Sequence, residues 1–106
     1  MRIAITGATG LIGRQVVAAL KERGDEVTAL SRDPRQGEQW DPMHEPAPAQ
    51  ALAGRDAIVH LAGENIAQRW SAAAKQTIRD SRVTGTRQLV RGIGELAEAE
   101  RPRVLV

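Results

Sequence analysis

Residues 2–13 read Arg-Ile-Ala-Ile-Thr-Gly-Ala-Thr-Gly-Leu-Ile-Gly, a short apolar run followed by three glycines spaced G-x-x-G-x-x-G. The apolar run is typical of a strand buried on both faces in a parallel sheet. From Leu11 to about Arg23 apolar residues recur at helical spacing, and Gly24 supplies the expected helix stop. The stretch therefore predicts a strand, a glycine-rich turn and a helix in succession.

This turn has the composition of a site for a dinucleotide pyrophosphate. Gly7 permits a tight turn, Gly10 keeps a Cβ away from the phosphates, and Gly13 lets the helix pack closely on the strand. The start of the helix adds free amides and the positive end of its dipole. The alternative is a purely structural turn; a P-loop is excluded because no Gly-Lys-Ser/Thr follows. The predicted site is Gly7, Ala8, Thr9, Gly10, Leu11, Ile12 and Gly13.

Strand-like and helix-like segments alternate along the rest of the chain, which predicts an α/β fold: a Rossmann-type, doubly wound parallel sheet of strand order 3-2-1-4-5. Residues 31–50 contain four prolines and are expected to be mostly loop. The expected strands are 26–30, a brief edge strand at 38–40, 56–62 and 102–106. The expected helices are 49–53 and 71–98.

The end of the second strand reads Leu30-Ser31-Arg32-Asp33. At this place in the fold an acidic residue accepts a hydrogen bond from the ribose 2′-OH of NAD, whereas an arginine pairs with the 2′-phosphate of NADP. Ser31 and Arg32 come first and favour NADP(H), with NAD(H) the less favoured cofactor. Asp33 takes the acidic role if the strand ends later, and ordinary loop polarity is the remaining alternative.

Leu61, Ala62, Gly63 and Glu64 follow the predicted strand 56–62, where a nicotinamide cofactor passes over such a sheet. We assign these four residues to the cofactor site, with Gly63 keeping the backbone clear; a simple strand terminator is the alternative. We interpret other conspicuous residues as structural: His60 as a core histidine, Trp40 and Trp70 as loop anchors, and Gly92-Ile93-Gly94 as helix fraying.

Composition limits the classes of function. The 106 residues carry 15 basic and 13 acidic side chains, and a net charge of only +2 is poor evidence for nucleic-acid binding. The sequence has no cysteine and two distant histidines, which gives no reason to expect a metal site. No apolar run approaches the length of a membrane span, and the chain starts directly with a strand, so we expect a cytoplasmic protein without membrane contact.

Several blocks together resemble the extended short-chain dehydrogenase/reductases, and more narrowly their NAD(P)-dependent, sugar-nucleotide epimerase-like members. The resemblance covers nearly the whole chain. The blocks are the opening 1–14, Ser31-Arg32, Leu61-Ala62-Gly63-Glu64-Asn65-Ile66-Ala67, Arg69-Trp70 and Arg79-Asp80-Ser81-Arg82.

The resemblance implies a domain two to three times this length and a Tyr-x-x-x-Lys pair for hydride chemistry. This sequence has no tyrosine, so no catalytic residue is assigned. We expect residues 1–106 to be an NAD(P)-binding Rossmann domain truncated in its fifth strand, with the small-molecule substrate bound only by the full-length protein. An unfinished apolar edge at 104–106 predicts self-association. The open alternatives are the cofactor part of an epimerase or reductase, a non-catalytic NADP-binding redox sensor, and a scaffold that has lost its ligand.

Overall fold

One parallel sheet organises the chain in the computed structural model, which describes residues 1–61 and 72–106. The strand order is β3-β2-β1-β4-β5, as the sequence predicts. Within the sheet Ile3 of β1 lies between Val27 of β2 and Ala57 of β4, so the central strand is paired on both sides. The strands are β1 (Arg2–Thr6), β2 (Glu26–Ser31), β3 (Glu38–Gln39), β4 (Ala57–His60) and β5 (Val104–Leu105).

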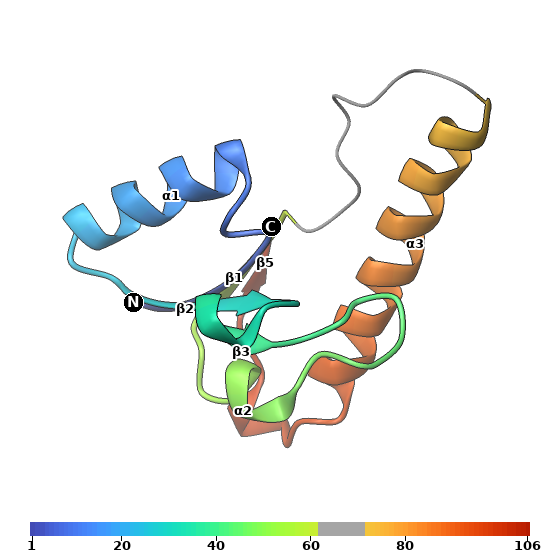
Figure 1. Cartoon of the computed structure of the whole chain (residues 1–106). Coiled ribbons are helices and arrows are strands. Elements are labelled where there is room, and N and C mark those ends of the chain that lie inside the picture. Colours follow the sequence, from blue (N-terminus) through green and yellow to red (C-terminus); the bar gives the residue numbers. More distant parts are fainter. Residues whose placement is uncertain (62–71) are drawn as a thin grey trace.

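The helices cover both faces of the sheet (Figure 1). The chain passes from β1 through α1 (Leu11–Glu22) to one side, and from β4 through α3 (Ala72–Gly94) to the other. Right-handed crossovers in opposite directions place α1 and α3 on opposite faces. The short α2 (Ala49–Leu52) shares the face of α3, and the 3₁₀ turns η1 (Pro34–Gln36) and η2 (Glu98–Glu100) lie in the connections.

The main core lies between the sheet and the α2–α3 face. It contains no residue of α1. Trp40 is 2% exposed there, and its indole nitrogen donates to the Glu45 carbonyl at 2.9 Å, which confirms the prediction that it anchors the loop. The core residues are Ala4, Leu30, Trp40, Ala47, Ala51, Leu52, Ile58, Leu89 and Leu96.

The start of α1 and its end after Glu22 agree with the sequence prediction. Gly24 has φ +92°, a left-handed conformation that suits glycine, and its N–H donates to the Lys21 carbonyl at 3.0 Å. The Asp25 N–H donates to the Leu20 carbonyl at 3.0 Å. Two of the last carbonyls of the helix are thereby satisfied, and the chain turns into β2.

Helix α3 departs from the prediction at its C-terminus. It ends at Gly94 and not at Glu98, because the Arg101 guanidinium donates to the carbonyls of Gly94 and Leu96, both at 3.1 Å. The interpretation of Gly92 as a fraying residue was also wrong. Gly92 is buried, and a Cβ on it would lie 2.5 Å from the Ala47 carbonyl oxygen. Only glycine lets the helix approach this loop so closely.

Strands β4 and β5 are also shorter than predicted. β4 spans Ala57–His60 instead of 56–62, and β5 pairs with it through Val104 and Leu105. These two side chains are about half exposed. The self-association predicted from this edge stays a prediction.

Candidate functional site

The turn after β1 has the backbone that its glycines suggest. Gly7 has φ +71°, and its carbonyl accepts a hydrogen bond from the Gly10 N–H at 3.2 Å. A Cβ on Gly13 would overlap the Gly7 carbonyl oxygen and lie 2.9 Å from the Cα of Ala8. The first and third glycines are therefore required by the turn itself.

Gly10 differs from Gly7 and Gly13, because the protein leaves room for a Cβ at this position. It is the N-cap of α1 with φ −71°, and a Cβ on it would make only an ordinary contact of 3.5 Å with the Gly7 carbonyl oxygen. The fold therefore does not require glycine at this position. A Cβ here is excluded only if something outside the chain must approach the backbone.

The N-terminus of α1 lies open beside this turn. Among the described residues, no hydrogen bond uses the N–H groups of residues 11–13, and the first turn holds no acidic side chain. Leu11 and Ile12 are 72% and 64% exposed. The open amides and the positive helix end thus form a surface suited to an anion.

Ser31, Arg32 and Asp33, at the end of β2 and just after it, make different contacts. The Ser31 hydroxyl accepts a hydrogen bond from the Asp33 N–H at 3.1 Å. The Asp33 carboxylate caps η1 and accepts two bonds from the Arg35 guanidinium, at 3.2 and 3.1 Å, and these contacts with Arg35 lower its pKa. Asp33 is thereby engaged within its own turn. Arg32 is exposed, and its charge helps to lower the pKa of Asp41, after the larger effects of His44 and Met43.

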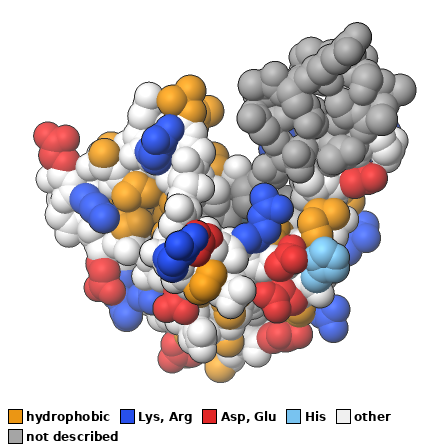
Figure 2. All heavy atoms as spheres, in the orientation of Figure 1, with side chains coloured by type: hydrophobic (Ala, Val, Ile, Leu, Met, Phe, Trp, Pro, Cys, Tyr) orange, Lys and Arg blue, Asp and Glu red, His pale blue; other side chains and the backbone are white. Residues whose placement is uncertain are grey.

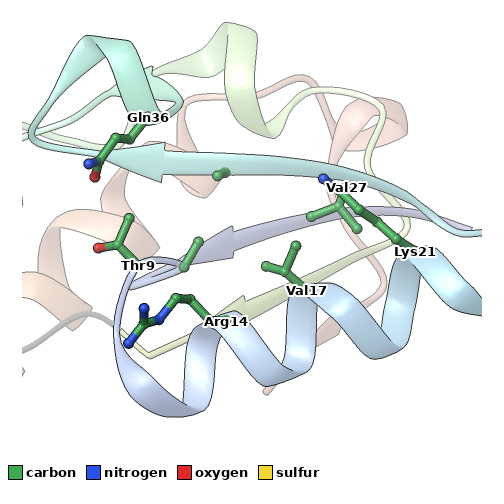
Figure 3. A pocket seen from close by; sticks show the side chains of 8 residues that line it. Thr9, Arg14, Val17, Lys21, Val27 and Gln36 are labelled. Carbon is green, nitrogen blue, oxygen red and sulfur yellow. The ribbon is translucent and has the colours of Figure 1, made fainter.

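A groove of about 260 Å³ lies between α1 and β2. Thr9, Arg14 and Gln36 gather at one end, beside the glycine-rich turn and the carboxyl end of β2, while Val17, Val27 and Lys21 line the other end (Figure 3). The sequence prediction included Thr9 but missed Arg14 and Gln36. For Arg14 a signal was available, since a basic residue directly after the third glycine falls in the first helical turn.

At the carboxyl ends of β1 and β4, His60 joins three elements. Its Nδ1 lies 2.7 Å from the Thr6 hydroxyl, and its Nε2 lies 3.1 Å from the hydroxyl of Thr86 in α3. The Thr6 hydroxyl also accepts a hydrogen bond from the Leu61 N–H at 3.0 Å. His60 is half-buried and lies outside the main core, so it is not the core histidine that the sequence predicts. Its hydrogen bonds nevertheless give it a structural role, because they tie α3 to the start of the segment that follows β4.

The remaining predicted site residues are only partly covered by the structure. Leu61 lies directly after β4, whereas Ala62, Gly63 and Glu64 fall outside the described residues, as do Trp70 and Ser71, the first residue of the predicted helix 71–98. The part of the chain that the structure describes holds no group of three or more His, Asp or Glu side chains placed to bind a metal ion. Of its helices, none is long and apolar enough to cross a membrane.

Comparison with known proteins identifies the family. The model of the NAD dependent epimerase/dehydratase family matches residues 3–105. The chain belongs to this family. Among its relatives are an epimerase family protein of Mycobacterium bovis, 41% identical over 92% of this chain, and the epimerase family protein YfhF of Bacillus subtilis, 36% identical over the whole chain. The chain spans 34% and 36% of these two relatives, about a third of their length.

Solved structures of epimerase family proteins show the same arrangement. The human epimerase family protein SDR39U1, crystallised with NADPH, aligns with 99% of this chain at a TM-score of 0.76 and 31% identity. A nucleoside-diphosphate sugar epimerase from Corynebacterium glutamicum aligns over the same share at 0.75 and 37%. The chain covers 35% and 21% of these two structures. It therefore has the NAD(P)-binding, Rossmann-type fold of epimerase family proteins.

The surroundings of His60 predict that the free energy of unfolding of the chain depends on pH. Burial, and then the positive charge of Arg82, lower the pKa of His60 below its ordinary value of 6.5. The unfolded chain therefore takes up a proton first as the pH falls, so the free energy of unfolding decreases below pH 6.5 until the folded state is protonated as well. Above that pH the contribution is constant.

Urea denaturation across this pH range, on the wild type and on His60→Gln, measures the contribution. Glutamine keeps hydrogen-bonding groups but does not titrate, so the fall in stability just below pH 6.5 should be smaller in the variant. An identical fall in both proteins would show that His60 is not its source.

Proposed function

We propose that this chain binds NADP(H) as the cofactor-binding part of an NAD(P)-dependent epimerase/dehydratase or reductase-like protein. The observation that carries the proposal is the open turn at Gly7, Gly10 and Gly13 below the uncapped N-terminus of α1. Its amides suit a pyrophosphate, and the space above Gly10 allows the phosphates to approach the backbone. The proposed cofactor residues are Gly7, Ala8, Thr9, Gly10, Leu11, Ile12, Gly13, Ser31, Arg32, Leu61, Ala62, Gly63 and Glu64.

The preference for NADP(H) over NAD(H) is supported by the charges after β2. Asp33, which would otherwise accept a hydrogen bond from the ribose diol of NAD, already holds the Arg35 guanidinium. No carboxylate among the described residues lies within ion-pair distance of Arg32. An arginine without a carboxylate partner beside the adenosine ribose favours a phosphate over a hydroxyl.

Side-chain charge on the surface is consistent with a small-molecule cofactor. The face shown in Figure 2 has basic and acidic side chains interspersed, without a continuous basic patch. With 15 basic and 13 acidic residues in the chain, long-range attraction to nucleic acid is weak. Anion binding must therefore come from local groups such as the turn and its neighbouring arginines.

The test is a calorimetric titration of the chain with NADPH and with NADH. We expect both to bind and NADPH to bind more tightly, and Arg32→Ala to weaken NADPH by about 1.5–3 kcal/mol, the value of a charged hydrogen bond, with a smaller effect on NADH. Arg87→Ala is the matched control, since Arg87 is also exposed but lies in α3, away from the end of β2. Absence of binding by either cofactor to the folded chain would contradict the proposal.

A second candidate is a non-catalytic NADP-binding module, which would use the same turn and the same open helix end. In the first candidate, proton and hydride transfer would need residues outside this chain, which spans about a third of the length of these relatives. A Tyr-x-x-x-Lys pair in a longer form of this protein, with NADPH oxidation in the presence of a carbonyl substrate, supports the enzyme. NADPH binding by a longer form without that pair supports the module.

A further inference from the structure

We infer that Arg14, assisted by Gln36 and Thr9, is a specificity-determining residue that binds the phosphate on the adenosine ribose. The inference rests on the proposed function and extends it to residues that the sequence prediction did not assign to this role. The three side chains come from three elements: the turn, the first helical turn of α1, and η1. Figure 3 shows them at the same end of the groove.

Their chemistry is complementary to a phosphate monoester. The Arg14 guanidinium supplies a charged, planar pair of donors, the Gln36 amide supplies N–H groups, and the Thr9 hydroxyl supplies one further donor. Thr9, Arg14 and Gln36 are all exposed, so a ligand can reach them. The groove also continues over Val17, Val27 and Ala29, an apolar floor without a competing anion.

Arg14 is free to bind an anion. In the described part of the chain Arg23, Arg35 and Arg55 each lie within 4 Å of a carboxylate, whereas no such ion pair involves Arg14. The first turn of α1 also carries no acidic residue. Its charge is therefore not neutralised by the protein.

The position of the groove indicates which phosphate it binds. The open amides at residues 11–13 face a ligand at the end of the helix, where we propose the pyrophosphate. The Arg14 end of the groove lies to the side, between α1 and β2, with Gln36 of η1 beside it (Figure 3). In this fold the end of the second strand is where the adenosine ribose lies. A group that distinguishes the two cofactors there is the 2′-phosphate.

Arg14 and Arg32 then differ in their surroundings. Arg32 is close enough to Asp41 for its charge to lower the pKa of that carboxyl. Arg14 has no acidic neighbour of this kind in the groove lining. We therefore assign a share of the 2′-phosphate discrimination to Arg14, in addition to that of Arg32.

Small probes isolate this contact from the nicotinamide half of the cofactor. Adenosine 2′,5′-bisphosphate carries the distinguishing phosphate, and adenosine 5′-monophosphate lacks it. We expect Arg14→Ala to weaken the bisphosphate by about 10-fold or more and to leave the monophosphate nearly unchanged, with Arg14→Lys intermediate because it keeps the charge without the planar donors. Arg87→Ala is the matched control, since it removes the same exposed charge from α3 on the opposite face of the sheet.

The outcomes separate this inference from the proposed function. If the wild type binds neither probe nor NADPH, the proposed function is wrong. If the wild type prefers the bisphosphate and Arg14→Ala keeps that preference, the cofactor proposal survives and the role of Arg14 is wrong. A thermal melt of each variant checks folding, and Gln36→Ala, with a smaller expected loss for the bisphosphate alone, tests the same contact at an independent exposed position.

Discussion

Replacing Gly13 by alanine is expected to lower the free energy of unfolding by about 3 kcal/mol and to abolish NADPH binding. The added Cβ overlaps the Gly7 carbonyl oxygen and lies 2.9 Å from both the Gly7 carbonyl carbon and the Ala8 Cα. These are backbone atoms, which cannot move aside without opening the turn or lifting α1 off β1. Urea denaturation gives the stability, and titration with NADPH gives the affinity.

Gly10→Ala is the matched control, with the same chemical change three residues earlier. Its Cβ makes only a 3.5 Å contact, and its φ of −71° suits any residue, so the variant should melt close to the wild type. It should nevertheless lose NADPH affinity, since the methyl group occupies the space where we place the phosphates. Full affinity in a folded Gly10→Ala protein would mean that the pyrophosphate does not lie over this turn.

The sequence was sufficient to predict the parts of the fold that depend on local signals. The strand 2–6, the glycine-rich turn and the start of α1 follow from an apolar run and from glycines with fixed spacing. The sheet order follows from alternating strands and helices joined by right-handed crossovers. Each of these features is decided within a few residues or by a general rule of chirality.

Features that depend on distant partners were not predictable in this way. The end of α3 at Gly94 depends on Arg101, which reaches back to two carbonyls. Within this helix Val83 and Val90 are 49% and 52% exposed, because the sheet and α2 cover only one side of it. The spacing of apolar residues along a helix does not show how much of its surface other elements cover.

In the candidate site too, features set by local sequence were predictable, whereas features set by distant contacts were not. The roles of Gly7 and Gly13 in the turn were predictable, because they are backbone requirements of a known turn. Whether Asp33 competes for the ribose depended on its bidentate contact with Arg35, which no spacing rule predicts. Gln36 reaches the groove only because η1 folds back beside the turn, so its proximity to Arg14 is a property of the tertiary structure.

Gly92→Ala is expected to lower the free energy of unfolding by about 2–3 kcal/mol, because the position is overpacked by a single methyl group. Its Cβ would lie 2.5 Å from the Ala47 carbonyl oxygen and 3.0 Å from the Ala47 nitrogen and Cβ. The N–H of Ala47 also donates to the Gln88 carbonyl of α3 at 3.2 Å, so this loop residue is fixed against the helix. Denaturation of the variant should show a lower midpoint with an unchanged slope.

Gly94→Ala separates this packing effect from the general preference of helices for alanine. A Cβ on Gly94 meets nothing within 4 Å, so the substitution should be neutral or stabilise the chain by up to about 1 kcal/mol. The two variants add the same methyl group two residues apart in one helix, yet only Gly92→Ala should destabilise the chain. Equal effects would mean that α3 does not pack on Ala47 as described. The loss at Gly92 alone would show that this glycine is required for close packing of the helix on its loop, as Gly13 is required on the other face of the sheet.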